Sequence, residues 1–345
     1  MSKGDLILRS QLRQFEEDTA SFIGVKQAVG LNSGTDALFL SLKAAGIGVG
    51  DEVITVAHTF VATLAVIVHC GATPVLVDVA DDMNMDVDQV EAKISPRTKA
   101  IIPVDLNGRL CDMGKLMKIA DKHNLKIVED ACQAHGAAFK NKRAGSFGDL
   151  GCFSFYPTKN LGGYGDSGAI TTNSKALYEK CVMLRNYGQK NRYIHVIKGM
   201  NSRMDELQAS ILNVKLNHLD YFVKKRITIA QIYLSNLNEV MQIQLPRVRN
   251  HTLHSFHLFV IQTENRSKLK EFLDEEGIET QIHYPIPIHK QECYKEFNTL
   301  RLPVTEKASD TILSLPIHPF LTGEEVLYIC SAIKKFYKLN FHKNL

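Results

Sequence analysis

The chain of 345 residues is 45% hydrophobic and 23% charged, which is ordinary for a globular enzyme and allows one large domain or two domains with separate cores. Its net charge of +4 is small and spread along the chain, which excludes the strongly basic pattern of nucleic-acid-binding proteins. Lysines at 334–338 are explained by a final helix, whose dipole they complement.

Export, a membrane anchor and a metal centre are not expected. The N-terminal residues lack the apolar segment of a secretory signal, and His69, Gly71 and Pro74 interrupt the apolar stretch 60–77. Seven cysteines without a C-x-x-C pair favour reduced core residues and offer no zinc or iron–sulfur ligand set. We expect a cytoplasmic protein with no metal.

Short apolar runs alternate with helix-length segments through the first two thirds of the chain. The predicted strands are residues 27–31, 52–56, 74–79, 100–104, 126–130, 151–156 and 169–172. The predicted helices between them are residues 35–45, 59–70, 87–94, 115–123 and 175–185. This alternation predicts an α/β domain around a mostly parallel sheet.

The pattern changes beyond residue 203. A long helical segment (203–240) is followed by a strand (256–262), a helix (267–276), a second strand (278–282) and a last helix (323–337). These elements predict a smaller α+β domain. We expect a large domain at 1–222 and a small domain at 223–345.

Several polar segments follow the predicted strands. Because ligands of parallel sheets bind beyond the carboxyl ends of the strands, these segments are expected to meet in one crevice. They are residues 32–34, 58–60, Asp130 and 156–159.

The turn at 32–38 leads from a strand into a helix. Gly34 permits close approach, and the free N–H groups of the first helical turn, at Thr35 and Asp36, suit a phosphate. An ordinary N-cap by Ser33 or Thr35 is equally compatible with this segment.

Lys159 follows a strand that ends at a proline, and Asp130 ends an earlier apolar strand. An amine near a buried carboxylate can hold an aldehyde cofactor as a Schiff base, with the acid on the ring nitrogen of the cofactor. Gln133 could reach the same ligand. The alternatives are a surface lysine at 159 and a salt bridge from Asp130 to an arginine or lysine.

Three other segments have competing interpretations. The glycines at 163–168 match G-x-G-x-x-G, but a strand pattern follows them where a dinucleotide site needs a helix, so we reject that site. The proline-rich loop 283–289 suits substrate contact or a structural turn equally well. At Asn201 and Ser202, a helix N-cap is the alternative to a ligand contact.

Five segments together resemble the DegT/StrS family, the sugar-nucleotide aminotransferases that depend on pyridoxal phosphate and have the fold of aspartate aminotransferase (fold type I). They occur in the order expected for that family and span nearly the whole chain. The segments are residues 32–38, 129–136, 153–160, 201–209 and 314–319.

This resemblance implies roles for individual residues. Lys159 would link to the cofactor and shuttle a proton, and Asp130 would keep the pyridine nitrogen protonated. Phe60 would stack on the ring, and Gln133 would lie near its phenolic oxygen. The phosphate would be held by Gly34, Thr35, Asp36 and Ser154, and in the partner subunit of a homodimer by Asn201.

The resemblance also implies a substrate. The family's sugar dehydratases carry histidine where this chain has Lys159, so the lysine favours transamination. The resemblance favours L-glutamate as donor and a dTDP- or UDP-linked 3-keto hexose as acceptor, giving an amino sugar for lipopolysaccharide, another surface polysaccharide or a glycosylated metabolite. A 4-keto sugar and a non-catalytic regulatory protein are the alternatives. Expected substrate contacts are Tyr156, Tyr187, Arg203, His283, Tyr284 and His289.

Overall fold

The computed structural model describes residues 6–341, so the N-terminal residues considered for a signal lie outside it. This part of the chain is built around a seven-stranded sheet in the order β1-β9-β8-β5-β4-β2-β3. Only β9 runs antiparallel to its neighbours, which confirms the mostly parallel sheet. The strands are β1 (Gln27–Leu31), β2 (Glu52–Val56), β3 (Thr73–Val77), β4 (Thr98–Ile101), β5 (Lys126–Asp130), β8 (Leu150–Ser154) and β9 (Gly168–Thr172).

Neighbouring residues of each central strand enter different hydrophobic cores, because successive side chains of a strand point to opposite faces. Ile54 and Ile127 belong to one core, whereas Val53 and Val128 belong to the other. One face packs on α1 (Ser10–Ile23), α4 (Met113–His123) and α6 (Glu206–Leu216). The other packs on α2 (Gly34–Ala44), α3 (Ala62–His69) and α5 (Lys175–Leu184).

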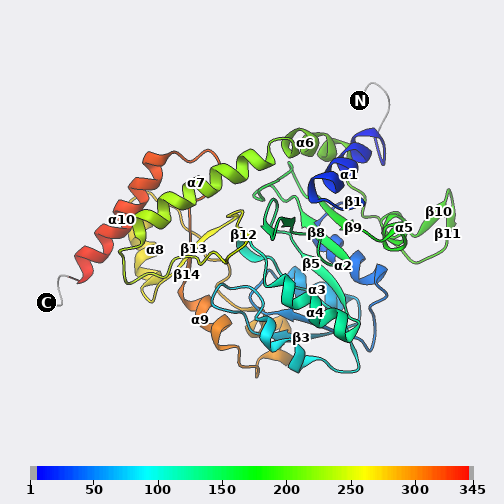
Figure 1. Cartoon of the computed structure of the whole chain (residues 1–345), viewed down its shortest axis with the longest axis horizontal. Coiled ribbons are helices and arrows are strands. Elements are labelled where there is room, and N and C mark those ends of the chain that lie inside the picture. Colours follow the sequence, from blue (N-terminus) through cyan, green and yellow to red (C-terminus); the bar gives the residue numbers. More distant parts are fainter. Residues whose placement is uncertain (1–5, 342–345) are drawn as a thin grey trace.

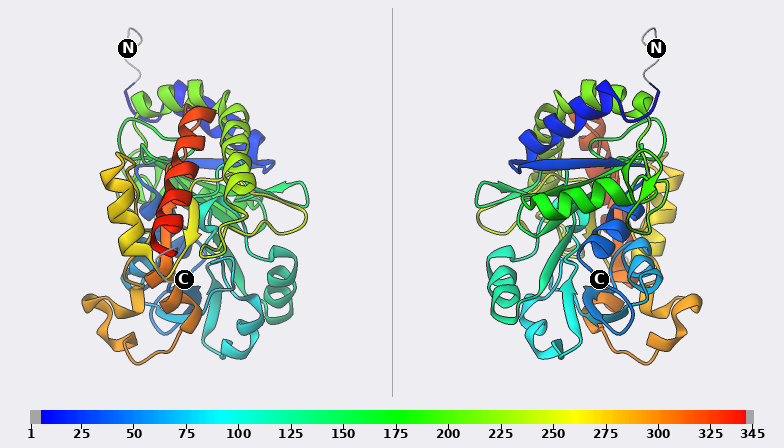
Figure 2. Two further views of the ribbon diagram at one scale, coloured as in Figure 1. Left: turned by 90° about the vertical axis from the view of Figure 1, so that its left-hand side faces the viewer. Right: turned by 90° about the vertical axis from the view of Figure 1, so that its right-hand side faces the viewer.

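The segment 203–240 forms two helices where one long helix was expected. The chain leaves α6 at Asn217 and enters α7 (Leu219–Leu237) after His218, whose φ of −107° and ψ of 0° are not helical. From there α7 runs to the far end of the molecule and packs beside α10 (Gly323–Phe341), as Figure 1 and both views of Figure 2 show.

The smaller part has its own hydrophobic core, formed by residues between Ile229 and Tyr337. Its elements are the antiparallel pair β13 (Phe259–Gln262) and β14 (Ile312–Leu315) with α8 (Arg266–Glu275), α10 and the C-terminal half of α7. The helix α9 (Pro303–Thr311) instead packs Ala308 into the core of the large part. The predicted domain boundary at residue 222 falls inside α7 and stays a prediction.

Two further sequence expectations were wrong. Residues 278–282 form no strand, because only Gln281 bridges Ser314 and the prolines after it lack an N–H donor. Residues 87–94 form two 3-10 turns, η1 (Val87–Gln89) and η2 (Glu91–Lys93), and the chain is already extended at Ile94, ahead of Pro96.

Several short elements had no sequence prediction, and α1 was missed entirely. The three-stranded sheet β12-β6-β7 brings residues 252–253 of the later chain back onto the large part. The short elements are β6 (Ala138–Phe139), β7 (Lys142–Arg143), β10 (Gln189–Asn191), β11 (Ile194–His195), β12 (Thr252–Leu253), η3 (Leu106–Gly108), η4 (Ile288–Lys290) and η5 (Glu292–Phe297).

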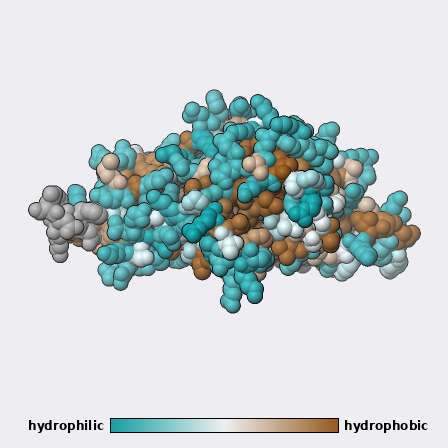
Figure 3. All heavy atoms as spheres, turned by 90° about the horizontal axis from the view of Figure 1, so that it is seen from below, coloured by the Kyte–Doolittle hydropathy of each residue, from teal (hydrophilic) through white to brown (hydrophobic). Residues whose placement is uncertain are grey.

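Among the described residues, no helix combines the length and apolar character needed to cross a bilayer. The antiparallel pair β10 and β11 projects from the large part near α5 (Figure 1). Apolar atoms gather at that end of the molecule and in the middle of the face seen in Figure 3, on an otherwise largely hydrophilic surface.

Candidate active site

A cavity of about 490 Å³ lies at the carboxyl ends of β5 and β8, beside the N-terminus of α2 and the loop that carries Tyr284. Its lining includes Ser33, Gly34, Thr59, Phe60, Asp130, Tyr156 and Lys159, so the expected segments do meet in one crevice. Three members of those segments do not line it: Asn32, His58 and Pro157. The remaining lining residues are Thr35, Leu38, Ala62, Thr63, Val104, Leu106, Cys132, Gln133, Ser154, Thr158, Asp166, His257, His283 and Tyr284.

Asp130 is the buried carboxylate of this cavity, with 5% of its surface exposed. Its Oδ2 accepts a hydrogen bond from Thr63 Oγ1 at 2.8 Å, and its Oδ1 accepts one from the backbone N–H of Cys132 at 3.3 Å. Within residues 6–341 it has no ion pair with arginine or lysine, so the salt-bridge alternative was wrong. Its charge is therefore available to a cationic group of a ligand.

Lys159 lies in a turn just beyond β8, and its backbone N–H donates to the carbonyl of Tyr156 at 2.8 Å. The next side chain, Asn160, donates from Nδ2 to the carbonyl of Ser255 at 3.1 Å, which fixes the turn against the later chain. Burial lowers the pKa of Lys159, while Cys132 and Asp130 oppose that shift. The lysine lines the cavity, so the surface-lysine alternative was wrong.

Three buried groups surround the lysine without adding charge. Burial and Lys159 lower the pKa of His135 to about 3 and that of His257 well below its ordinary value. Burial, followed by Asp130, raises the pKa of the Cys132 thiol. Near neutral pH, both histidines and the thiol are uncharged.

The first turn of α2 closes one end of the cavity. Ser33 is its N-cap and accepts a hydrogen bond from the backbone N–H of Asp36 at 3.1 Å, which confirms the capping alternative. Gly34 packs so closely that an added Cβ would lie 2.6 Å from Ser154 Cβ. Gly34 and Thr35 line this end of the cavity, and their N–H groups precede the first intrahelical donor, Ala37.

Aromatic and amide groups close the opposite side. The rings of Phe60 and Tyr284 lie 5.9 Å apart between centroids, and Phe60 lines the cavity with 55% of its surface exposed. Gln133 accepts from the backbone N–H of Asn107 at 2.9 Å and donates to the Tyr284 hydroxyl at 3.2 Å. Burial raises the pKa of Tyr284 to about 12, so this hydroxyl keeps its proton.

The structure leaves some predicted site residues outside the cavity. Asp36 turns its backbone N–H to Ser33, and His289 is fully buried and bonds Glu306 through Nε2 at 3.0 Å. Asn201 pairs with Asn186 in an isolated bridge and is not an N-cap, since α6 begins after Asp205. The other predicted contacts outside the cavity are Tyr187 and Arg203, which lie near each other.

Sequence reasoning missed Thr63, a lining residue that bonds a predicted one. Thr63 lies in the first turn of α3 and donates to Asp130, and it bonds Thr59, which precedes the helix and belongs to the expected segment 58–60. In the predicted helix 59–70 a spacing of four places these two side chains on one face, which was the available signal. His257 and Cys132 carried no such signal.

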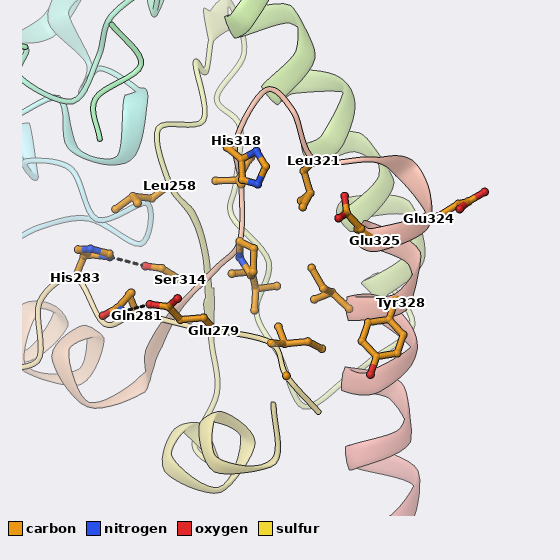
Figure 4. Close-up of a pocket in the computed structure, with 16 residues that line it drawn as sticks. Leu258, Glu279, Gln281, His283, Ser314, His318, Leu321, Glu324, Glu325 and Tyr328 are labelled. Carbon is orange, nitrogen blue, oxygen red and sulfur yellow. Dashed lines mark hydrogen bonds between the residues drawn. The ribbon is translucent and has the colours of Figure 1, made fainter. Parts of the chain in front are cut away.

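A second cavity, of about 650 Å³, lies in the small part between β14, α10 and the segment after α8 (Figure 4). His283 lines both cavities, and its Nδ1 lies 2.9 Å from Ser314 Oγ. Glu279, Glu324 and Glu325 line this second cavity, with no lysine or arginine among its described lining residues. It is therefore a poor site for a phosphate, and the chemistry belongs to the smaller cavity.

Comparisons with known proteins agree with this geometry. Residues 1–334 match the model of the DegT/DnrJ/EryC1/StrS aminotransferase family. A "dTDP-3-amino-3,6-dideoxy-alpha-D-galactopyranose transaminase" of Aneurinibacillus thermoaerophilus is 44% identical over 97% of this chain and 93% of its own length. A "pleiotropic regulatory protein" of Geobacillus stearothermophilus is 42% identical over 98% of this chain and 92% of its own length.

A solved structure from Bacillus subtilis, NtdA with bound cofactor PMP, superposes with a TM-score of 0.92. It is 33% identical, and the match covers 98% of this chain and 79% of that one. The likeness confirms the expected fold, a large α/β part with a smaller C-terminal part. With its family model matched over nearly the whole sequence, the chain belongs to the DegT/DnrJ/EryC1/StrS aminotransferase family.

Proposed function

We propose that the protein is a pyridoxal-phosphate-dependent aminotransferase that moves an amino group from L-glutamate to a nucleotide-linked 3-keto hexose. The observation that carries the proposal is a single cavity lined by Lys159 and by a buried Asp130 that lacks an ion-pair partner in the described chain. An amine and an unpaired carboxylate in one apolar cavity are the groups that this cofactor needs.

The described residues fit the cofactor at each of its polar ends. Asp130 would face the ring nitrogen and Lys159 the aldehyde, while Gln133 would lie near the phenolic oxygen. The free N–H groups of α2 would face the phosphate, with Ser154 packed against Gly34. Phe60 supplies an exposed ring for stacking.

When bound, the cofactor supplies an electron sink for the carbon that exchanges its amino group. Lys159 moves a proton to and from that carbon, and its lowered pKa places more of its amine in the neutral, proton-accepting form. Asp130 holds the proton of the ring nitrogen through its negative charge. A lysine at this position favours transamination over the dehydration performed by family members that carry histidine there.

The sugar is inferred from a relative. The Aneurinibacillus protein is named for an amino group at carbon 3, which supports a 3-keto substrate over a 4-keto one. The product would be an amino sugar for a surface polysaccharide such as lipopolysaccharide, or for a glycosylated metabolite. Tyr156, His283 and Tyr284 line the cavity and are the proposed sugar contacts within one chain.

A homodimer is part of the proposal, because some predicted ligand contacts lie away from the cavity of their own chain. Asn201 is exposed and accepts from Arg203 Nε at 3.0 Å, and Tyr187 lies beneath the same guanidinium. We propose that these residues complete the site of the partner subunit. Free cysteines at all seven positions support the proposed cytoplasmic location.

A regulatory protein without turnover is the second candidate, favoured by the name of the Geobacillus relative. The two candidates differ in one measurement. A transaminase converts its bound cofactor to the amine form on addition of glutamate, whereas a regulatory protein leaves the visible absorption band unchanged.

The test is the visible absorbance of the purified protein. The wild type should be yellow and its visible band should bleach with glutamate, and the band should be absent in Lys159→Ala. Incubation with a panel of 3-keto and 4-keto sugar nucleotides, with NMR to locate the new amine, identifies the acceptor. A colourless protein without affinity for pyridoxal phosphate would refute the proposed function, and amination of 4-keto sugars alone would refute the carbon-3 assignment.

A further inference from the structure

Two threonine hydroxyls and Asp130 form a chain of hydrogen bonds. Thr63 Oγ1 lies 2.8 Å from Asp130 Oδ2, and Thr59 Oγ1 lies 2.9 Å from Thr63 Oγ1. All three side chains are at most 5% exposed, so bulk water does not compete for these bonds. Both threonines line the cavity that holds Lys159.

The direction of the protons in this line follows from counting them. An ionised carboxylate only accepts hydrogen bonds, and each hydroxyl has one proton to donate. Thr63 therefore donates its proton to Asp130, which leaves its oxygen as an acceptor. The proton between the two hydroxyls must then come from Thr59.

Such a line stabilises the ionised form of the carboxylate. A hydrogen bond donated to the charged form of an acid favours that form, and a donor that itself accepts a bond is polarised toward stronger donation. Within residues 6–341 Asp130 has no cationic side chain bonded to it. Its carboxylate accepts from Thr63 Oγ1 and from the Cys132 N–H, and Thr59 acts on it only through Thr63.

Two other buried carboxyl groups, Asp105 and Glu129, lie near Asp130. Burial, followed by Glu129 and Asp130, raises the pKa of Asp105 well above its ordinary value, which disfavours a second negative charge beside Asp130. Glu129 accepts three backbone N–H bonds from residues 145, 147 and 148 and faces that loop. The other titratable groups around Asp130 include Lys159, Cys132, Cys152 and Tyr284, and burial raises the pKa of both thiols and of the phenol.

We propose that Thr63 and Thr59 are positioning residues, whose hydroxyls form a relay that keeps Asp130 ionised and directed at the ring nitrogen of the cofactor. This inference rests on the proposed function, because the ring nitrogen belongs to pyridoxal phosphate. The relay acts through Asp130 and does not touch the reacting carbon. Its loss lets the ring nitrogen release its proton and weakens cofactor binding.

The test compares four variants of the full chain. Thr63→Val removes the hydroxyl and keeps the shape, Thr63→Ser restores a hydroxyl, and Thr59→Val removes only the outer donor. The matched control is Thr55→Val, since Thr55 is also fully buried but donates to the carbonyl of Ile102 on the neighbouring strand. The two measurements are the Kd of pyridoxal phosphate and the NMR shift of its isotope-labelled ring nitrogen in the loaded enzyme.

Thr63→Val should weaken cofactor binding about ten-fold, the loss of one hydrogen bond to a charged group, and should move the ring-nitrogen shift toward the unprotonated value. Thr59→Val should move both readings the same way by a smaller amount, and Thr63→Ser should restore them. Thr55→Val should leave both readings at wild-type values.

The inference is overturned if Thr63→Val, or Thr59→Val where Thr63→Val does not fold, keeps the wild-type ring-nitrogen shift and binds the cofactor within two-fold of wild type. Equal changes in Thr55→Val would also overturn it, because they would reflect general destabilisation. A wild-type protein that binds no pyridoxal phosphate refutes the proposed function itself, which separates the two failures.

Discussion

Gly34 occupies the point where the helix that faces the proposed phosphate site touches the strand that leads to Lys159. A Cβ at this position would lie 2.6 Å from Ser154 Cβ and 3.1 Å from both Ser154 Cα and Cys132 Sγ. These neighbours belong to, or directly follow, central strands and cannot move independently of the sheet. The absence of a side chain is therefore what lets α2 reach the cavity.

We predict that Gly34→Ala forces α2 away from Ser154 and weakens the binding of pyridoxal phosphate at least ten-fold, with a loss of about 1–3 kcal/mol in the free energy of unfolding from overpacking. Gly48→Ala is the matched control, because its added Cβ would meet only the carbonyl of Cys70 at 3.8 Å. Absorbance titration and urea unfolding measure the two effects. Cofactor affinity equal to that of wild type in Gly34→Ala would contradict the assignment of the phosphate end.

At the residue scale, the sequence indicated which polar groups meet but not how they bond. Strand ends and glycines placed Asp130, Lys159 and Gly34 correctly in one crevice. The hydrogen-bond partners of Gln133 are the backbone N–H of Asn107, in a 3-10 turn, and the hydroxyl of Tyr284, 151 residues after Gln133. Such long-range bonds depend on tertiary packing, which local patterns do not encode.

At the scale of elements, one helix is fixed in place by another through a single carboxylate. Glu206, at the start of α6, accepts backbone N–H bonds from Arg9, Gln11 and Leu12 at the start of α1. Arg9, the N-cap of α1, makes no side-chain capping bond. Glu206 therefore supplies the missing cap from a position almost two hundred residues away.

We predict that Glu206→Gln lowers the free energy of unfolding by about 1–3 kcal/mol, because the new NH₂ group faces backbone donors and leaves at least one of them unsatisfied. Glu17→Gln, on the exposed face of α1, should change it by less than about 0.5 kcal/mol. Urea unfolding measures both variants, and limited proteolysis near residue 9 reports release of α1. Equal stabilities of the two variants would show that α1 is held by its apolar face alone.

The same helix shows why part of the fold was missed. The buried residues of α1, including Leu12, Phe15, Thr19 and Ile23, follow helical spacing, but the helix lacks an N-cap signal in its own sequence. The central strands were found because their apolar runs are continuous, as expected for a sheet covered on both faces. Two-residue strands such as β6 and β7 exist only because β12 returns to pair beside them, so no local pattern marks them.

At the scale of the whole molecule, the smaller part completes the cavity of the larger one. Arg226 of α7 donates from Nη1 to the carbonyls of Phe256, His257 and Ile317, at 3.0–3.2 Å. These bonds connect the long helix to the segment that carries His257 into the cavity and to the segment after β14. The geometry near Lys159 therefore depends on how the two parts pack.

Buried neutral histidines make the stability of this packed molecule depend on pH. Burial lowers the pKa of His58 to about 4 and that of His135 to about 3, and in the described chain neither ring nitrogen of His58 has a hydrogen-bond partner. At low pH the unfolded chain binds a proton at each ring near its ordinary pKa of 6.5, whereas the folded chain does not. The unfolded state then holds more protons, so stability is lost as the pH falls below that value.

We predict that His58 alone costs the fold about 2 kcal/mol between pH 7 and pH 5, since each pH unit below the unfolded pKa costs about 1.4 kcal/mol per proton. The variant His58→Asn should therefore lose about 2 kcal/mol less than the wild type over this interval, whatever its stability at pH 7. His218→Asn is the control, because His218 is exposed, and it should follow the wild-type pH dependence. Urea unfolding at both pH values measures the difference.

Asp105 and Glu129, whose pKa values burial raises, oppose this pH dependence equally in all three proteins, so they cancel from the comparison. A loss in His58→Asn as large as in the wild type would mean that the folded protein protonates His58 by pH 5, and that its ring is hydrated in solution.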